Sequence, residues 1–245
     1  MKREFPTTPA EAFESSIEGA YFADQIARAE MEGRIGHFAP DPRFAINSAW
    51  DIGVSDSTAI WFFQFLSDSG RLRFLHYYEM SGEGAEHYAA KIKQLSHHWP
   101  VYGYHFLPHD VAVTEWGTNK TRPEQLIALG VRPSRVPRHE VQDGINGVRM
   151  SFSRMEFDEN GCAEGLKALR AYRREWDEDR GCWKNKPRHD WASHGADALR
   201  YGVMAAGERM KTLLTDVIPP AEDMRLAVLC PTDPKTQRGV TLDEL

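Results

Sequence analysis

Residues 44–59 place the strongest constraint on how this chain can fold. They read Phe-Ala-Ile-Asn-Ser-Ala-Trp-Asp-Ile-Gly-Val-Ser-Asp-Ser-Thr-Ala, an apolar run that ends in an acid and a glycine before a turn and a second apolar run. We interpret residues 44–51 as a buried strand that ends at Asp51. A carboxylate in such a place is costly unless something pairs with it, and Gly53 lets a ligand or another backbone come close. The alternative is the aspartate of an ordinary turn, where Asp and Gly are both common.

The composition allows one α/β domain with extensions or two small domains. The chain has 245 residues, of which 41% are hydrophobic and 11% aromatic, so it can form a sizeable core. Its mean hydropathy is −0.54, and no apolar run approaches the roughly 18 residues of a membrane span. The first residues, Met-Lys-Arg-Glu-Phe, lack the apolar segment of a signal peptide. We therefore expect a cytosolic protein that makes no contact with a membrane.

The three cysteines, Cys162, Cys182 and Cys230, are far apart in the chain and odd in number. They form no Cys-x-x-Cys pair, which argues against a zinc site or a disulfide framework. We expect free thiols in a reducing compartment.

The apolar pattern predicts a sheet that begins as a three-strand antiparallel meander with short links. The predicted strands cover residues 44–51, 58–66, 72–80, 101–107 and 131–136. The predicted helices cover 10–31, 84–99, 123–129, 143–155, 163–176 and 190–210, with a turn or small hairpin at 179–187. A meander followed by strands that alternate with helices is typical of an α/β fold with a mixed central sheet and helices on both faces. We expect an approach segment with one helix, a core domain and an irregular tail, at residues 1–43, 44–210 and 211–245.

Two later acids stand in places as unusual as that of Asp51. Asp110 ends a second predicted buried strand. Asp197 lies inside the last predicted helix, although aspartate is a poor residue for a helix interior. Its neighbours are small and would let that helix pack closely on a sheet: Ser193, Gly195, Ala196 and Ala198.

The last predicted helix also carries a polar stripe. Asp190, His194, Asp197 and Tyr201 are spaced i, i+4, i+7 and i+11, so they share one face. Asp190 is either a member of that stripe near the site or the N-cap of the helix. His194 either orients Asp197 or a water molecule or is a packed core histidine. Asp56 is in the same way either a further acid beside the site or merely the acid of a turn.

Asp51, Asp110 and Asp197 together suit a site for divalent metal. Three carboxylates that meet would repel strongly without cations, and hard oxygen ligands select Mg²⁺ or Mn²⁺ rather than Zn²⁺. Two such ions about 3.5–4 Å apart can activate a water and stabilise the leaving oxygen when a phosphodiester is hydrolysed. We therefore predict that the three acids hold two ions in a nuclease, with Asp51 as the central ligand on the middle strand. The chain has no Gly-x-x-x-x-Gly-Lys-[Ser/Thr] motif, so no ATP-binding P-loop is predicted.

The charge of the chain is uneven. Its net charge is −6, yet residues 120–154 hold seven basic and only three acidic side chains. A local basic face on an acidic protein suits a polyanion that is touched on one side; the alternative is a set of ordinary solvated charges. The candidates for contacts with DNA phosphates are Lys120, Arg122, Arg132, Arg135 and Arg138.

Four motifs give the chain a resemblance to a known family. They are Phe-Pro-Thr-Thr-Pro-Ala-Glu-Ala-Phe at 5–13, Trp-Asp-Ile-Gly-Val-Ser-Asp-Ser-Thr-Ala-Ile at 50–60, Leu-Pro-His-Asp at 107–110 and Ser-His-Gly-Ala-Asp-Ala-Leu-Arg-Tyr at 193–201. In this order and spacing they resemble the nuclease domain of the large terminase subunit of tailed bacteriophages, which has an RNase H-like fold. The resemblance covers about residues 4–207. It implies that Asp51, Asp110 and Asp197 are the metal-binding acids, although the family's middle acid varies between Asp and Glu.

The resemblance also implies a function. Such domains follow a packaging ATPase and cut concatemeric double-stranded DNA at the start and end of genome packaging, in the host cytoplasm. The implied partners are that ATPase domain, the small terminase subunit and the portal. Because no ATPase precedes the first motif, we expect an excised domain or a short gene product. The alternatives are a junction resolvase or exonuclease on the same fold, or a catalytically silent docking module of the packaging motor.

Overall fold

The computed structural model describes residues 19–53, 57–99, 103–111 and 120–213. Its main strands are β1 (Ile35–Gly36), β2 (Ile46–Asp51), β3 (Ser57–Leu66), β4 (Arg71–Ser81), β5 (His105–Leu107), β6 (Pro133–Arg135) and β7 (Met155–Asp158). Its helices are α2 (Ala23–Met31), α3 (Ala85–Ser96), α4 (Arg122–Ala128), α5 (Val141–Ser151), α6 (Ala163–Ala171) and α7 (Trp191–Leu213), with a 3₁₀ turn, η1 (Phe152–Arg154). A separate hairpin joins β8 (Arg174–Asp177) to β9 (Cys182–Pro187).

The seven main strands form one mixed sheet in the order β1-β7-β4-β3-β2-β5-β6. β2, β3 and β4 make the predicted antiparallel meander. β5 is parallel to β2, β6 to β5, β7 to β4 and β1 to β7, so β3 alone among the described strands of this sheet runs against the others. As a result β2, β5 and β6 end at the same edge of the sheet. This is the edge where side chains that follow these strands can meet.

The expectation that Asp51 lies on the middle strand is wrong. The middle strand is β3, and β2 is its neighbour on the β5 side. The difference comes from β7 and β1, which the sequence pattern did not predict and which extend the sheet beyond β4. Each is short, with four and two residues, and β7 was included in a predicted helix at its first residue. Without these two strands β2 would be the middle strand.

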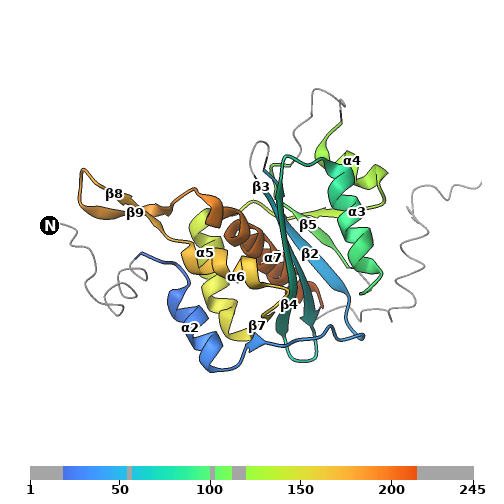
Figure 1. Cartoon of the computed structure of the whole chain (residues 1–245), viewed down its shortest axis with the longest axis horizontal. Coiled ribbons are helices and arrows are strands. Elements are labelled where there is room, and N and C mark those ends of the chain that lie inside the picture. The colour runs from blue at the N-terminus through green and yellow to red at the C-terminus, as the bar shows by residue number, and fades with distance from the viewer. Residues whose placement is uncertain (1–18, 54–56, 100–102, 112–119, 214–245) are drawn as a thin grey trace, which may run out of the picture.

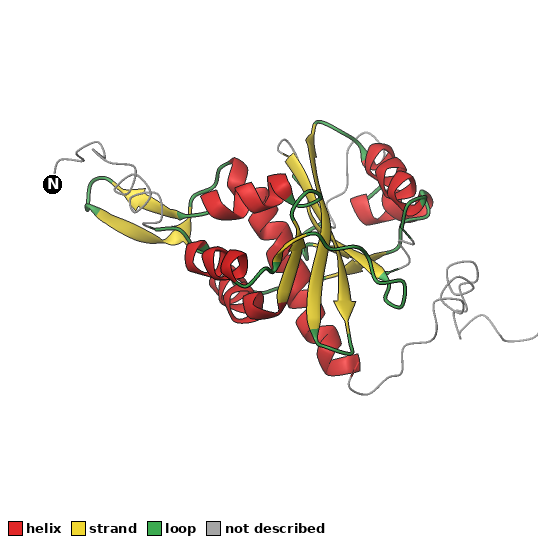
Figure 2. Cartoon of the chain, turned by 60° about the horizontal axis from the view of Figure 1, so that its bottom comes forward, coloured by secondary structure: helices red, strands yellow, loops and turns green. Residues whose placement is uncertain are grey.

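Helices cover both faces of the sheet (Figures 1 and 2). Trp61, Phe63 and Phe74 belong to a core on the face covered by α5, α6 and α7, whereas Ile60 and Phe62 belong to a second core on the face of α3. The alternation follows from the period of two along a strand. α7 packs closely on β2 and β3, as its small residues predicted, and a Cβ at Gly195 would lie 2.9 Å from the hydroxyl oxygen of Tyr77.

The approach segment joins this core instead of forming the long helix predicted for residues 10–31. Residues 1–18 lie outside the described part, and α2 begins only at Ala23. Before it, Gly19 has φ +82°, and Ala20 forms a β-bridge with Arg173, which keeps the chain extended. Tyr21 and residues of α2 are buried in the core of the α7 face. Residues 19–43 therefore share their core with the rest of the domain.

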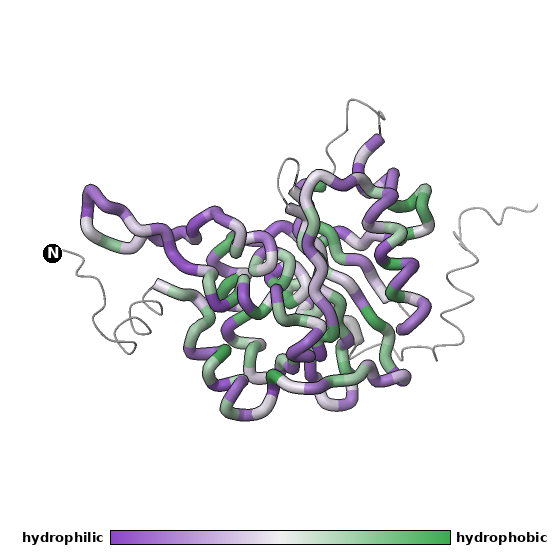
Figure 3. The backbone as a smooth tube through the Cα atoms, in the orientation of Figure 1, coloured by the Kyte–Doolittle hydropathy of each residue, from purple (hydrophilic) through white to green (hydrophobic). Residues whose placement is uncertain are grey.

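The predicted helix 163–176 is also too long. α6 ends at Ala171, and Trp176 lies in β8, where its ring packs against Trp183 at a centroid distance of 4.9 Å. The chain leaves the helix because backbone groups after Tyr172 pair with the approach segment, with the amide of Arg174 donating to the carbonyl of Gly19. The hairpin predicted near 179–187 is present and begins at Arg174. It projects from the body (Figure 1) and is mostly hydrophilic (Figure 3).

Three further features agree with the sequence. Cys162 and Cys182 are free thiols, while Cys230 lies outside the described residues. The described residues include no helix long and apolar enough to cross a membrane. The last helix is predicted to begin at Asp190 and does begin one residue later, at Trp191.

Candidate functional site

Asp51 and α7 meet at the edge of the sheet where β2 ends. Asp51 is the last residue of β2 and is paired across the ladder with Ala59 of β3. Its side chain is 20% exposed, and its Oδ2 lies 3.2 Å from Nδ1 of His194. His194 comes from the first part of α7 and is 11% exposed at its side chain. The carboxylate of Asp51 therefore faces the helix that carries Asp197.

Asp197 lies one turn further along α7 and is held by two donors. Its Oδ1 accepts a hydrogen bond of 3.4 Å from the hydroxyl of Tyr172 and lies 3.1 Å from Nη2 of Arg200. Burial raises the pKa of Asp197 to about 6; the Arg200 guanidinium opposes this rise and the Asp51 carboxylate adds to it. The charge of Asp51 thus reaches Asp197, so that the two acids form an anionic pair beside the sheet.

Asp110 comes to the same edge from β5. The parallel pairing of β2 and β5 places Ala49 beside Phe106, so Asp51 and Asp110 both follow strands that end side by side. The hydroxyl of Tyr201 reports the arrangement. Burial raises its pKa first, Arg200 opposes this, and the charges of Asp51, Asp197 and Asp110 each raise it further. All three predicted acids therefore lie within electrostatic range of one hydroxyl group.

The acids do not close into a finished metal site. In the part of the chain that the structure describes, no group of three or more His, Cys, Asp or Glu side chains is close enough to hold an ion. The donor set nevertheless fits a hard divalent cation, because Asp51 and Asp197 present carboxylate oxygens whose mutual repulsion a cation would relieve. Asp51, Asp197 and Asp110 remain the predicted ligands.

The fold around these acids can be compared with known proteins. No family model matches the chain. It is 25% identical over 178 residues to the terminase large subunit of Escherichia phage T5, covering 71% of this chain and 38% of that protein. The P22 large terminase nuclease domain superposes with a TM-score of 0.55 at 20% identity, over 79% of this chain and 94% of that one. This chain has the fold of a large-terminase nuclease domain.

The structure of a large terminase from a thermophilic bacteriophage gives the same result, with a TM-score of 0.54 at 19% identity over 70% of this chain and 42% of that one. The expected RNase H-like fold is thereby confirmed. The chain spans 38% of the length of the phage T5 relative, so it corresponds to a part of a large terminase. The nuclease fold places the end of β2 and α7 against each other, where the predicted acids lie.

The other predicted site residues take different positions. Asp190 caps α7, since its Oδ1 accepts a hydrogen bond of 3.0 Å from the amide of Ala192. This is the N-cap alternative, and it places Asp190 before the helical stripe. His194 contacts Asp51 directly. Asp56 and most of the loop that follows Asp110 lie outside the described residues.

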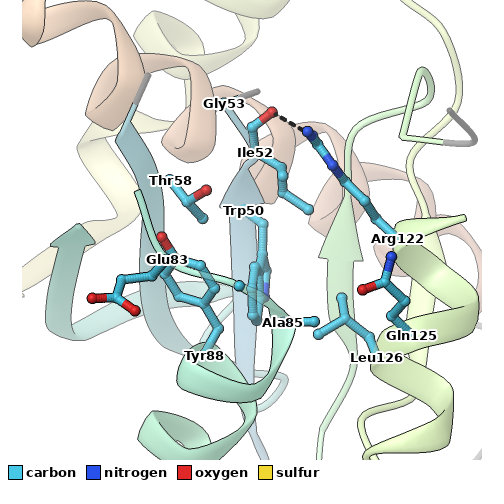
Figure 4. Close-up of a pocket in the computed structure, with 11 residues that line it drawn as sticks. Trp50, Ile52, Gly53, Thr58, Glu83, Ala85, Tyr88, Arg122, Gln125 and Leu126 are labelled. Carbon is cyan, nitrogen blue, oxygen red and sulfur yellow. Dashed lines mark hydrogen bonds between the residues drawn. The ribbon is translucent and has the colours of Figure 1, made fainter. Parts of the chain in front are cut away.

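The basic candidates fall into two groups. Lys120, Arg132, Arg135 and Arg138 are exposed. Arg122 instead turns inward, and its Nη1 donates a hydrogen bond of 3.2 Å to the carbonyl of Ile52, the residue after Asp51 (Figure 4). Arg122 thus holds the backbone beside the site.

The contact of Arg122 lies at a cavity of about 110 Å³ between β2, α3 and α4. Trp50, Tyr88 and Leu126 form its apolar wall, and Glu83 and Gln125 lie at its rim. Because Trp50 precedes Asp51 on the strand, its side chain points to the opposite face. The cavity is therefore behind the sheet, away from the side where Asp51 meets α7.

Tyr172 and Arg200 are the site residues that sequence reasoning missed. Arg200 follows Asp197 by three residues, a spacing that brings side chains together on a helix and was available as a signal. Tyr172 offered no such signal, because its contact depends on how the end of α6 packs against α7. The predicted helix through Trp176 also gave this residue a wrong backbone conformation.

Proposed function

We propose that this chain is a metal-dependent endonuclease domain of a viral DNA-packaging terminase, which cuts concatemeric double-stranded DNA in the host cytoplasm. The observation that carries the proposal is the meeting of Asp51 with α7, where His194 lies 3.2 Å from Asp51 and the charge of Asp51 acts on Asp197. The large-terminase nuclease fold supports it. The phage T5 relative is longer than this chain, which supports a packaging ATPase domain, together with a small terminase subunit and a portal, as partners.

In this proposal Asp51, Asp110 and Asp197 hold two Mg²⁺ or Mn²⁺ ions. When bound, such ions supply an activated water and stabilisation of the leaving oxygen in phosphodiester hydrolysis. Asp51 contributes from the rigid end of β2 and is oriented by His194. Asp197 contributes from α7 a carboxylate whose burial disfavours its charged form in the absence of a cation.

The exposed basic residues supply the contact with DNA in this proposal. Lys120 precedes α4, and Arg132, Arg135 and Arg138 lie in and beside β6, whose end faces the same edge as the ends of β2 and β5. Contacts of this kind bind phosphates without reading sequence and weaken with salt. Arg122 acts instead on the backbone after Asp51.

Cleavage of plasmid DNA in the presence of Mn²⁺ or Mg²⁺ tests the proposal. We expect the wild type to linearise the plasmid, and Asp51→Asn and Asp197→Asn each to lose more than about 100-fold in rate, since even residues behind metal ligands contribute about 10–100-fold. Asp24→Asn, an exposed change on α2, should cut like the wild type. Equal cleavage by Asp197→Asn, or cleavage that resists a chelator, would refute the assignment.

The same assay separates the rival activities. Preference for branched DNA would indicate a junction resolvase, and release of mononucleotides would indicate an exonuclease. Absence of both Mn²⁺ binding and cleavage, measured at high protein concentration, would instead support a silent docking module. Each of these three outcomes would overturn the endonuclease proposal.

A further inference from the structure

We infer that Tyr172 and Arg200 are positioning residues that fix the carboxylate of Asp197, an inference that rests on the proposed metal site. Both donors act on one oxygen, Oδ1, from opposite elements: Tyr172 from the end of α6 and Arg200 from α7 itself. A carboxylate has two oxygens, so donors that share Oδ1 leave Oδ2 for a cation. They also prevent the group from turning about its terminal torsion, which is otherwise broad.

Tyr172 is held rigidly enough to orient a neighbour. Its side chain is 1% exposed, and its ring packs against those of Tyr21 and Phe22 at centroid distances of 5.1 and 5.8 Å. Its own carbonyl accepts a hydrogen bond of 3.0 Å from the amide of Tyr21. The approach segment therefore clamps Tyr172 from the side opposite α7, and only its hydroxyl reaches the acid.

Arg200 lies in a slot made by a missing side chain. It is 6% exposed at its side chain, and a Cβ built at Gly144 of α5 would lie 2.1 Å from its Cδ. No side chain larger than hydrogen fits at that position while Arg200 stays in place. A guanidinium this deeply buried requires an anionic partner, and Asp197 is the partner that the structure provides.

The lengths of the two contacts agree with a positioning role. The hydrogen bond from Tyr172 is long, at 3.4 Å, compared with a usual value of about 2.7–2.8 Å between oxygens. Contacts in active sites are often long in the free protein and shorten when the site is filled. Residues behind the ligands of a metal orient those ligands and contribute about 10–100-fold to affinity or activity.

A pair of matched variants tests the role of Tyr172. Tyr172→Phe removes only the hydroxyl that reaches Asp197 and keeps the ring in its cluster. Tyr21→Phe removes a hydroxyl from the same cluster, one that is buried and contacts no site residue. Mn²⁺ binding is measured by calorimetry without DNA at one fixed alkaline pH, and plasmid cleavage is measured in parallel. We expect Tyr172→Phe to weaken Mn²⁺ binding about 10-fold and Tyr21→Phe to leave it unchanged.

Arg200 is tested with Arg200→Lys and Arg200→Gln, each checked for folding by its thermal melt. Lys keeps the charge but loses the planar fork, so we expect Mn²⁺ affinity between those of the wild type and the Gln variant. If the wild type binds Mn²⁺ and Tyr172→Phe and folded Arg200→Gln bind it equally well, the positioning inference is wrong and the proposed function stands. If the wild type binds no Mn²⁺, the proposed function fails and the inference fails with it.

Discussion

The charge of Asp197 is the residue-scale feature with the clearest consequence. Its pKa is raised to about 6 by burial, from an ordinary value near 3.8. The protonated form is therefore favoured in the folded state. The stability contributed by this proton is fully present below about pH 3.8 and is lost as the pH rises through about 6. Metal-free protein at neutral pH must consequently hold a carboxylate that would be more stable protonated.

We predict that Asp197→Asn removes this pH dependence. Thermal unfolding in a chelator is followed from pH 4 to pH 8 for the wild type and the variant. Relative to the variant, the wild type should lose on the order of 2 kcal/mol across the window from about pH 4 to pH 6. The difference between the two proteins is needed because burial lowers the pKa of His105 to about 4, which removes stability as the pH falls through the same range. A constant difference across the window would show that Asp197 is not strained.

The sequence indicated some residues of the candidate site and not others, for a physical reason. Asp51 and Asp197 stood out because a carboxylate at a buried strand end or in a helix interior conflicts with its local environment. His194 followed from helical spacing, and the structure brings it to Asp51. Tyr172 could not be predicted, since an aromatic residue at the end of an amphipathic helix is ordinary. Its importance comes from tertiary packing alone.

At the scale of elements, the distance between α7 and β2 decides whether Asp197 reaches Asp51. Gly202 sets this distance, because a Cβ built there would lie 2.8 Å from the Cβ of Ala49 on β2. A side chain at this position must push the helix from the sheet. The same helix contains Gly207, where a Cβ would meet nothing within 4 Å.

These two glycines form a matched pair for a prediction. Gly202→Ala should destabilise the protein by about 1–3 kcal/mol through overpacking and weaken Mn²⁺ binding, because it shifts α7 against β2. Gly207→Ala should stabilise it by up to about 1 kcal/mol through helix propensity and leave Mn²⁺ binding unchanged. Chemical denaturation and calorimetry measure both quantities. Equal effects of the two changes would mean that close packing at Gly202 does not position the site.

The pairing of β2 with β5 is the second element-scale determinant, since it brings Asp110 beside Asp51. The ladder is short, and a buried polar chain reinforces it: Nε1 of Trp50 donates to Oγ of Ser48 at 2.7 Å, and that oxygen lies 2.7 Å from Nδ1 of His105. Ser48 is fully buried, so its hydroxyl links two strands where water cannot replace it.

We predict that Ser48→Ala costs about 2–4 kcal/mol in the free energy of unfolding. The change leaves two buried groups, on Trp50 and His105, without their partner, and each such group costs about 1–3 kcal/mol. Ser151→Ala serves as the control, because Ser151 is buried as well but has only a 3.4 Å contact with Arg154. Urea denaturation compares the two variants. A loss for Ser48→Ala no larger than that for Ser151→Ala would contradict the linking role.

At the scale of the whole molecule, the sequence predicted the central part of the sheet better than its border. The meander was predicted because long strands with strong apolar patterns, such as β3, identify themselves. β1 and β7 were missed because a strand of two to four residues has too short a pattern to be distinguished from its neighbours. Their absence made β2 the expected middle strand. The approach segment was separated from the core for the same reason, since its contacts are all long-range.

The layout of the sheet leads to a last prediction, on DNA binding. Arg135 ends β6 and Arg138 follows three residues later, both exposed and at the edge toward which β2 and β5 also run. If both bind phosphates, Arg135→Ala/Arg138→Ala should weaken binding to unrelated duplexes to the same extent. It should also reduce the slope of log affinity against log salt by about 2, since each phosphate contact contributes about 0.9. Arg28→Ala/Lys93→Ala removes two exposed charges from α2 and α3 and should leave the slope unchanged. Fluorescence anisotropy at several salt concentrations measures all three proteins, and equal slopes for the two double variants would place the DNA on another face.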